Sequence, residues 1–267
     1  GKKIVILGSG DIGLIMARRL TLEGAKVEGV IEIMPFSNGL TRNVVQCLED
    51  YEIPLYLAHT VTAIHGHDRV TGITCAKVDE KMQPVAGTEF ELDCDCLLLS
   101  VGLIPENELS RDLVTIDKVT NGPVVDQYRQ TSVPGFFAAG NVVHVHDLVD
   151  FVSEEGEIAG KSAALYAQNK LGMTEKNIAV IPSTGMRTAV PQTINCSSDK
   201  EPVKLFMRVR QPARKVILDV KSAGKLLLTR KLPVAKPGEM IVITIPHDNL
   251  TTAGDEIIVT LRQEAIV

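Results

Sequence analysis

The sequence is poor in features that would place it in several well-known classes of protein. Its five cysteines are few for 267 residues and include no C-x-x-C pair. Such usage argues against a disulfide framework and predicts reduced, mostly structural thiols of a cytoplasmic protein. The cysteines are Cys47, Cys75, Cys94, Cys96 and Cys196.

Basic runs and long apolar runs are also lacking. The formal net charge of -5 argues against a nucleic-acid surface or an anionic membrane as the main partner. Apolar stretches such as residues 95–104 are too short to span a bilayer, and no secretory signal is visible. We therefore expect a small-molecule substrate, and leave open a partner subunit or a homodimer.

What the sequence does contain is a glycine-rich turn between a strand pattern and a helix pattern. The apolar run 4–7 comes before it, and helical spacing over residues 14–20 follows it. This order is the dinucleotide-binding fingerprint G-x-G-x-x-G. The expected cofactor-binding residues in this turn are Gly8, Ser9, Gly10, Asp11, Ile12 and Gly13.

Each glycine of the fingerprint has a mechanical reason. Gly8 permits the tight turn, Gly10 lets the backbone approach a pyrophosphate, and Gly13 lets helix and strand pack closely. The pyrophosphate would lie at the helix N-terminus, where free N–H groups and the helix dipole favour negative charge. The alternative is a glycine turn that merely closes a βαβ unit.

Glu32 ends the next strand pattern, residues 26–32, about two dozen residues after Gly8. That spacing is near the one expected of the acidic residue that binds the adenine ribose hydroxyls. A carboxylate there would repel a 2′-phosphate, so NADH is preferred over NADPH, although Arg42 in the following loop could tolerate a phosphate. The alternative is a solvated glutamate at the end of a strand.

The rest of the first hundred residues predicts more of an α/β domain. Residues 41–52 have a helical pattern, and residues 53–57 fit a third parallel strand. Short alternating runs from residue 61 to residue 92 predict an antiparallel meander. The continuous apolar run 94–101 predicts a buried central strand that returns to the parallel sheet.

The later residues change in character. Residues 122–126 predict a strand, and residues 153–171 a helix with Ser153 as its N-cap. From residue 177 on, five alternating strands predict a small β-sandwich of immunoglobulin-like type, with residues 178–202 as a loop-rich junction. The strands are expected at residues 203–209, 215–220, 225–232, 239–245 and 256–261.

The first 170 residues resemble the flavin-dependent pyridine nucleotide–disulfide oxidoreductase superfamily. Three stretches carry the resemblance: the glycine turn with Glu32, the strand that ends at Gly102, and residues 131–141. The last is similar to the family's second flavin motif, which ends Ala-x-Gly-Asp. Residues 101–107 and 146–150 resemble amino-acid and opine oxidising members, including subunits of sarcosine-oxidase and cyanide-synthase type.

The resemblance implies a Rossmann-like NAD-binding domain at residues 1–105 and the C-terminal half of an FAD-binding domain at residues 106–176. Residues 177–267 would be the β-sandwich. It also implies that Gly140 approaches the FAD pyrophosphate and that Asn141, where the family has aspartate, contacts ribityl or phosphate oxygens. The helix N-terminus near Ser153 would face the flavin pyrimidine ring.

The sequence departs from the family in two ways. The family's first glycine-rich FAD half is absent, so we expect a fragment of a longer flavoprotein, or a first half on another chain. The usual redox disulfide is also missing. Cys94 and Cys96 alternate on a strand and so share one face, which favours a buried structural role over redox chemistry.

No catalytic constellation can be argued from spacing. His144 and His146 form a pair without a third ligand, so no metal is expected. Asp147 and Asp150 are candidates for substrate contacts, although capping or solvation is favoured. Glu106 is placed near the nicotinamide by family geometry but is not expected to be catalytic.

The function expected is that of an FAD- and NAD-dependent oxidoreductase portion, in which hydride passes between NADH and flavin. The first alternative is an NAD-binding or electron-transfer subunit that recognises a partner chain through its β-sandwich. A weaker alternative is a single-domain NAD-dependent dehydrogenase without flavin, which residues 131–141 disfavour.

Overall fold

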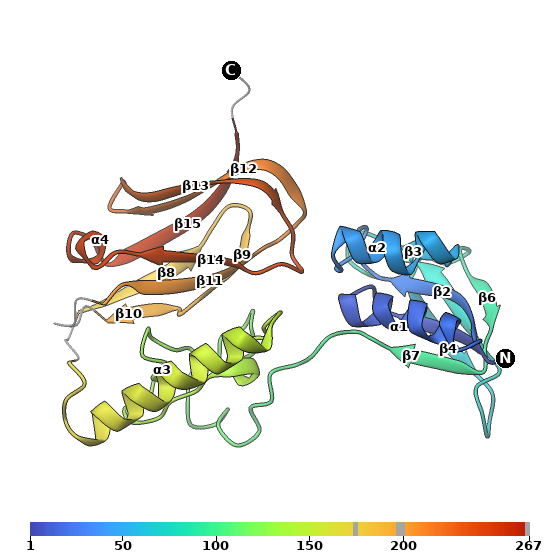
Figure 1. The fold of residues 1–267 in the computed structure, drawn as a ribbon, viewed down its shortest axis with the longest axis horizontal. Coiled ribbons are helices and arrows are strands. Elements are labelled where there is room, and N and C mark those ends of the chain that lie inside the picture. Colours follow the sequence, from blue (N-terminus) through green and yellow to red (C-terminus); the bar gives the residue numbers. More distant parts are fainter. Residues whose placement is uncertain (173–175, 196–200, 265–267) are drawn as a thin grey trace. The chain divides into compact units, whose positions relative to one another are not determined.

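The computed structural model describes residues 1–172, 176–195 and 201–264. The chain forms two compact units, Gly1–Gly102 and Leu103–Val267, and each is described by itself (Figure 1). Cys196, one of the expected structural thiols, lies outside the described residues. Within the described part, no helix is both long enough and apolar enough to cross a membrane.

The first unit is built on a four-stranded parallel sheet in the order β3-β2-β1-β7. Strand β1 is followed by a turn, helix α1 and then β2, which pairs with β1 in parallel. This arrangement confirms the predicted βαβ unit. The elements are β1 (Lys3–Leu7), α1 (Asp11–Leu22), β2 (Lys26–Glu32), α2 (Thr41–Cys47), the 3₁₀ helix η1 (Glu49–Tyr51), β3 (Leu55–Leu57) and β7 (Cys96–Leu99).

Strand β7 returns to the parallel sheet as predicted, but its predicted place in the sheet is wrong. It pairs with β1 alone in the described sheet and so lies at the edge. Leu99 is 65% exposed and Val101 is 67% exposed. The continuous apolar run predicted a strand in the centre of the sheet. Such a run does not distinguish a central strand, with a neighbour on each side, from an edge strand with only one.

The predicted meander is confirmed as a three-stranded antiparallel sheet, β4 (His59–His65), β5 (Gly72–Lys77) and β6 (Phe90–Asp93). Its buried residues Ile73 and Cys75 pack with Val5 and Ile31 from the parallel sheet. Cys94 belongs to the same cluster, whereas Cys96 is exposed, so the two thiols do not share a face as expected. Cys94 lies before β7 begins and is therefore outside the strand's alternation.

The second unit begins with residues that form turns and isolated bridges. The strand expected at residues 122–126 is wrong: Pro123 and Val125 each make only an isolated bridge. The short 3₁₀ helix η2 (Gly140–Val142) and the long helix α3 (Val149–Ala167) follow. Helix α3 begins four residues earlier than expected, with Leu148 at its N-cap position, so Ser153 is inside the helix and caps nothing.

Two sheets form the predicted β-sandwich, in the orders β10-β8-β15-β12-β13 and β14-β11-β9. All five predicted strands are present. The elements are β8 (Asn177–Pro182), β9 (Met186–Val190), β10 (Thr193–Asn195), β11 (Val203–Val209), β12 (Ala213–Ser222), β13 (Lys225–Ala235), β14 (Ile241–Ile245), α4 (His247–Thr251) and β15 (Glu256–Gln263).

The interpretation of residues 178–202 as a loop-rich junction is wrong, because β8, β9 and β10 lie there. Ile178 and Met186 from this segment are fully buried and share one core with Leu205 of β11 and Leu218 of β12. The segment is punctuated by proline and glycine, which hid its short apolar strands in the sequence. The sandwich core therefore begins at β8.

Candidate nucleotide-binding turn and flavin-motif segment

The glycine turn follows the carboxyl end of β1, beside the end of β7. Gly8 has φ +103°, and a Cβ there would meet the carbonyl oxygen of Ser100 at 2.1 Å. The N–H of Gly8 donates to the carbonyl of Ile31 at 2.7 Å, which ties the turn to β2. The switch in strand order between β1 and its two neighbours is the place where open α/β sheets bind ligands.

Gly10 and Gly13 differ in the space around them. A Cβ on Gly10 would meet nothing within 4 Å, so the backbone there is open to a ligand. A Cβ on Gly13 would lie 2.5 Å from the carbonyl oxygen of Gly8, so the helix approaches the turn closely. Gly10 is the N-cap of α1 and no side chain caps the helix, which leaves its first N–H groups for an anion. These residues fit a pyrophosphate.

Glu32 is buried, with 3% of its surface exposed, so the alternative of a solvated strand-end glutamate is wrong. One carboxylate oxygen accepts hydrogen bonds from the backbone N–H and the hydroxyl of Ser9, at 3.0 and 2.5 Å. Among the described residues, the other oxygen accepts only the N–H of Met34, at 2.8 Å. Since an ionised carboxylate offers about four acceptor sites, this second oxygen can still take a ribose hydroxyl.

Asp11 and Ile12 lie in the first turn of α1. The Asp11 carboxylate accepts the N–H of Leu40 at 2.8 Å and the side-chain amide of Asn43 at 2.7 Å. It therefore fixes the start of α2 against α1, a role that the sequence did not reveal. Ile12 is 69% exposed, and Arg42 is exposed on α2.

The residues of the second flavin motif lie in the second unit. Gly140 has φ +74°, and its N–H donates to Glu155 of α3 at 2.8 Å. The side-chain oxygen of Asn141 accepts the N–H of His146 at 3.1 Å. Its amide NH₂ has no partner within the described part of the chain, so it can donate to a ribityl or phosphate oxygen.

Glu155 is the centre of a buried polar network that sequence reasoning missed. It is 0% exposed, and its oxygens lie 3.1 Å from the guanidinium of Arg129 and 3.0 Å from Nε2 of His144. Nε2 of His146 also lies 3.1 Å away, but its direction is not that of a hydrogen bond. Glu154 and Glu155 are adjacent and alike in the sequence, and only burial distinguishes Glu155.

Burial and pairing oppose each other in this network. Burial by itself would raise the pKa of Glu155, but the hydrogen bond from His144, the nearby His146 and the charge of Arg129 hold that pKa well below its usual range. Burial lowers the pKa of His144, so this imidazole stays neutral at pH 7. The network therefore contains a carboxylate and a guanidinium that compensate each other.

The ligand atoms of His144, His146 and Glu155 all lie within 4.8 Å of one another, which is close enough for a metal site. The sequence argument assumed that the two histidines have no third ligand nearby. That assumption is wrong, because Glu155 lies beside them. However, both Glu155 oxygens already accept hydrogen bonds, and the charge of Arg129 at 3.1 Å opposes a dication. We therefore still predict that these three residues bind no metal ion.

Asp147 is exposed, which agrees with the expected solvation, but its carboxylate also has partners that the sequence did not reveal. Its carboxylate forms an ion pair with Arg208 of β11 and accepts the N–H of Met240 at 2.6 Å. Arg208 also donates to the carbonyl of Val145 at 3.0 Å. The loop between the flavin motif and α3 is thus held by the β-sandwich.

The structure brings the remaining expected site residues into no shared site. Ser153 is exposed on α3, and Asp150 is exposed in its first turn. Glu106 is exposed and accepts the N–H of Glu108 at 2.9 Å, which makes a local turn. Gly102, with φ +90°, is the last residue of the first unit.

Comparison with known proteins agrees with this geometry. Residues 1–163 match the family model described as pyridine nucleotide-disulphide oxidoreductase. An NADH oxidase of Streptococcus pneumoniae is 29% identical over 151 residues, which cover 54% of this chain and 30% of that protein. The glutamate synthase [NADPH] small chain of Mycobacterium tuberculosis is 29% identical over 193 residues, which cover 62% of this chain and 38% of that protein.

A solved structure is also similar, the thioredoxin reductase of T. acidophilum, with 29% identity and a TM-score of 0.52. The match covers 63% of this chain and 53% of that one. The chain spans 30–38% of the length of the two curated relatives. It belongs to the pyridine nucleotide-disulphide oxidoreductase family, whose members are FAD-binding oxidoreductases that use NAD(P)H.

Proposed function

We propose that the chain supplies the NADH-binding domain and the second half of the FAD site of an oxidoreductase in which hydride passes between NADH and flavin. The open backbone at Gly10, at an uncapped helix N-terminus, is the observation that carries the proposal. The nicotinamide and the flavin supply the redox chemistry when they are bound. The chain's own residues bind and orient them.

In the first unit, the N–H groups at the start of α1 would hold the pyrophosphate, and Glu32 would accept a ribose hydroxyl. The burial of Glu32 supports the preference for NADH, because a 2′-phosphate would meet a carboxylate that is fixed by three hydrogen bonds. In the second unit, the free amide of Asn141 would donate to the flavin's ribityl or phosphate oxygens.

Titration of NADH and NADPH against the purified chain, followed by nucleotide fluorescence, tests the nucleotide site. We expect NADH to bind at least about tenfold more tightly, as expected for one unfavourable charge contact. Equal affinities would contradict the role of Glu32. Failure of both nucleotides to bind would overturn the proposed site as a whole.

A second candidate function is an NAD-binding subunit that acts only with another polypeptide. The contacts that hold the loop before α3 to the β-sandwich favour it, because a partner bound to the sandwich would act on that loop. Diaphorase activity of the full-length protein alone supports the first candidate. Activity that requires a co-purified polypeptide supports the second.

We also infer that the sandwich is immunoglobulin-like. Its strand orders support this: β11 pairs with β14 in one sheet, and β12 pairs with β13 and β15 in the other. In immunoglobulin-like domains strand B lies beside strand E, and strand C lies beside strand F. Here β11 and β14 would correspond to B and E, and β12 and β15 to C and F. A chain of residues 177–267 that unfolds cooperatively by itself would support this domain assignment, and one that stays unfolded would contradict it.

A further inference from the structure

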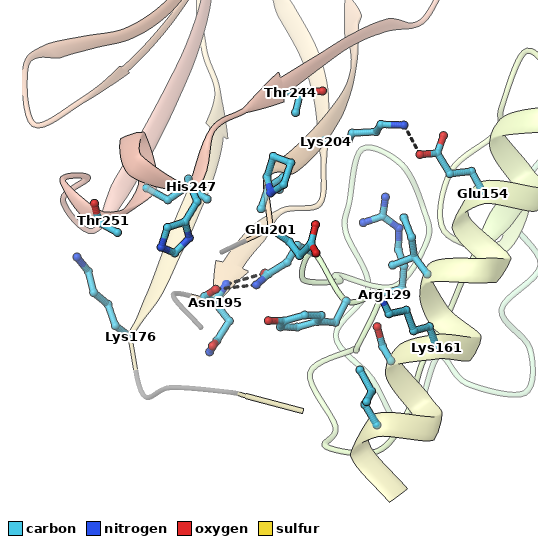
Figure 2. Close-up of a pocket in the computed structure, with 18 residues that line it drawn as sticks. Arg129, Glu154, Lys161, Lys176, Asn195, Glu201, Lys204, Thr244, His247 and Thr251 are labelled. Carbon is cyan, nitrogen blue, oxygen red and sulfur yellow. Dashed lines mark hydrogen bonds and ion pairs between the residues drawn. The ribbon is translucent and has the colours of Figure 1, made fainter. Parts of the chain in front are cut away.

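A cavity of about 590 Å³ lies between α3 and the β11 and β14 side of the sandwich (Figure 2). This volume is within the range of about 300–1,000 Å³ that small-molecule sites occupy. Helix α3 contributes residues spaced three or four apart, among them Ile158, Lys161 and Leu165, so one helix face forms the wall. The residues proposed above for NADH and flavin are not among its lining residues.

The charges in the cavity wall are unbalanced. Four cationic side chains line it, namely Arg129, Lys161, Lys176 and Lys204, against the carboxylates of Glu154 and Glu201. Arg129 is compensated by Glu155, which does not line the cavity, so the excess positive charge comes from the lysines. Lys204 is already paired with Glu154, and Figure 2 shows this contact across the cavity. Lys161 has no ion pair within the described part of the chain. It is therefore the cation most available to a ligand.

One buried donor in the same wall lacks a partner. Nε of Arg129, whose side chain is 1% exposed, has no hydrogen-bond partner among the described residues. The hydroxyl of Ser162, a residue that is 4% exposed, also lines the cavity. A buried polar group that is left unpaired is costly, so such groups commonly mark a place for a ligand atom or a water. An N–H can only donate, so the complementary ligand atom is an acceptor.

The rest of the wall is apolar. Ile158 and Leu165 on α3 and Leu250 on α4 line the cavity, and Leu250 is almost fully buried. A ligand that satisfies both parts of the wall carries an oxyanion on an apolar body. We propose that this cavity binds a small organic anion, either a carboxylate or a phosphate monoester. The proposal is independent of the proposed NADH and flavin chemistry.

Isothermal titration of the full chain with benzoate, phenyl phosphate and neutral benzyl alcohol tests the proposal. We expect saturable binding of at least one anion, at least about tenfold tighter than that of the alcohol. Tighter binding of benzoate identifies a carboxylate site, and tighter binding of phenyl phosphate identifies a phosphate site. Absence of saturation by both anions, or equal binding of the alcohol, would overturn the proposal.

Variants show whether binding takes place in this cavity. Lys161→Gln removes the unpaired cation from an exposed position and should weaken anion binding about tenfold, as expected for a lost charge-assisted hydrogen bond. Ser162→Ala should weaken it to a smaller extent. Lys225→Gln is the matched control, because Lys225 is exposed at the start of β13 and does not line the cavity.

Circular dichroism and thermal unfolding should be the same for the unmodified chain, Lys161→Gln and Lys225→Gln, since both lysines are exposed. Anion affinity that is equal in the two lysine variants would place binding outside the cavity and contradict the proposal. NADH affinity, measured in parallel, should be unchanged in both variants. A loss of anion binding with NADH binding intact therefore tests the cavity separately from the nucleotide site.

Discussion

The backbone N–H of Gly140 donates a hydrogen bond to the carboxylate of Glu155 at 2.8 Å. The two residues are joined across the loop that precedes α3, and the same carboxylate compensates the buried charge of Arg129. A single side chain thus fixes the backbone of the flavin motif and the position of the helix that follows it. Sequence spacing gave no indication of this relationship.

Glu155→Gln is expected to destabilise the second unit strongly, because it leaves Arg129 as an uncompensated buried charge. The expected loss in the free energy of unfolding is about 3–5 kcal/mol. Urea unfolding followed by circular dichroism measures it. Glu157→Gln, an exposed position on the same helix, should change stability by less than about 0.5 kcal/mol.

Combining Arg129→Met with Glu155→Gln removes both charges. The double variant should be more stable than the sum of the two single losses predicts, because no unpaired charge remains. Additive losses would mean that the two residues stabilise the unit separately.

Asp126 gives the second unit a distinct pH dependence. Burial raises the pKa of Asp126 to about 6, although its carboxylate accepts the N–H groups of Tyr128 and Gln130. The folded protein therefore holds a proton that the unfolded chain has released between about pH 4 and pH 6. This group's contribution to stability is present below that window and is lost as the pH rises through it.

Asp126→Asn cannot titrate and keeps an acceptor oxygen. At pH 7.5 it should be more stable than the unmodified chain by about 1–3 kcal/mol, and the difference should shrink toward pH 4. Urea midpoints at pH 4, 5, 6 and 7.5 measure this. A difference that is constant over the series would show that Asp126 does not retain its proton.

Alanine at Gly10 should mainly affect NADH binding, whereas alanine at Gly13 should mainly affect stability. Gly10→Ala has open space and a φ of −66°, so it should cost at most about 1 kcal/mol of stability. It should nevertheless weaken NADH binding at least about tenfold, because its methyl group occupies the proposed pyrophosphate position. Gly13→Ala meets the Gly8 carbonyl at 2.5 Å and should cost about 1–3 kcal/mol. Thermal unfolding and NADH titration of both variants measure the contrast.

Arg208→Met should release the loop before α3 from the sandwich. Arg208 holds Asp147 and the carbonyl of Val145, and the Met240 N–H also donates to Asp147. Loss of a hydrogen bond to a charged group costs about 1.5–3 kcal/mol, so amide exchange at Met240 should accelerate at least about tenfold. Hydrogen exchange by mass spectrometry or NMR measures this, and unchanged exchange at Met240 would contradict the role of Arg208.

Local patterns predicted much of the fold. The βαβ unit, the meander and five strands of the sandwich all follow from alternation, helical period and turn residues, which act within a few residues of one another. The errors arise where a pattern is interrupted or ambiguous. Residues 178–202 contain turn residues between short strands, and an apolar run such as 94–101 fits an edge strand as well as a central one.

The sequence by itself determined the glycine turn, the acidic residue that ends β2 and the family. These depend on residue type at fixed spacing along the chain. Tertiary structure alone decided that Glu32 is buried against Ser9, that Glu155 compensates Arg129, and that Asp147 meets Arg208. Burial and pairing of charges depend on which distant segments pack together, and spacing along the chain does not encode that.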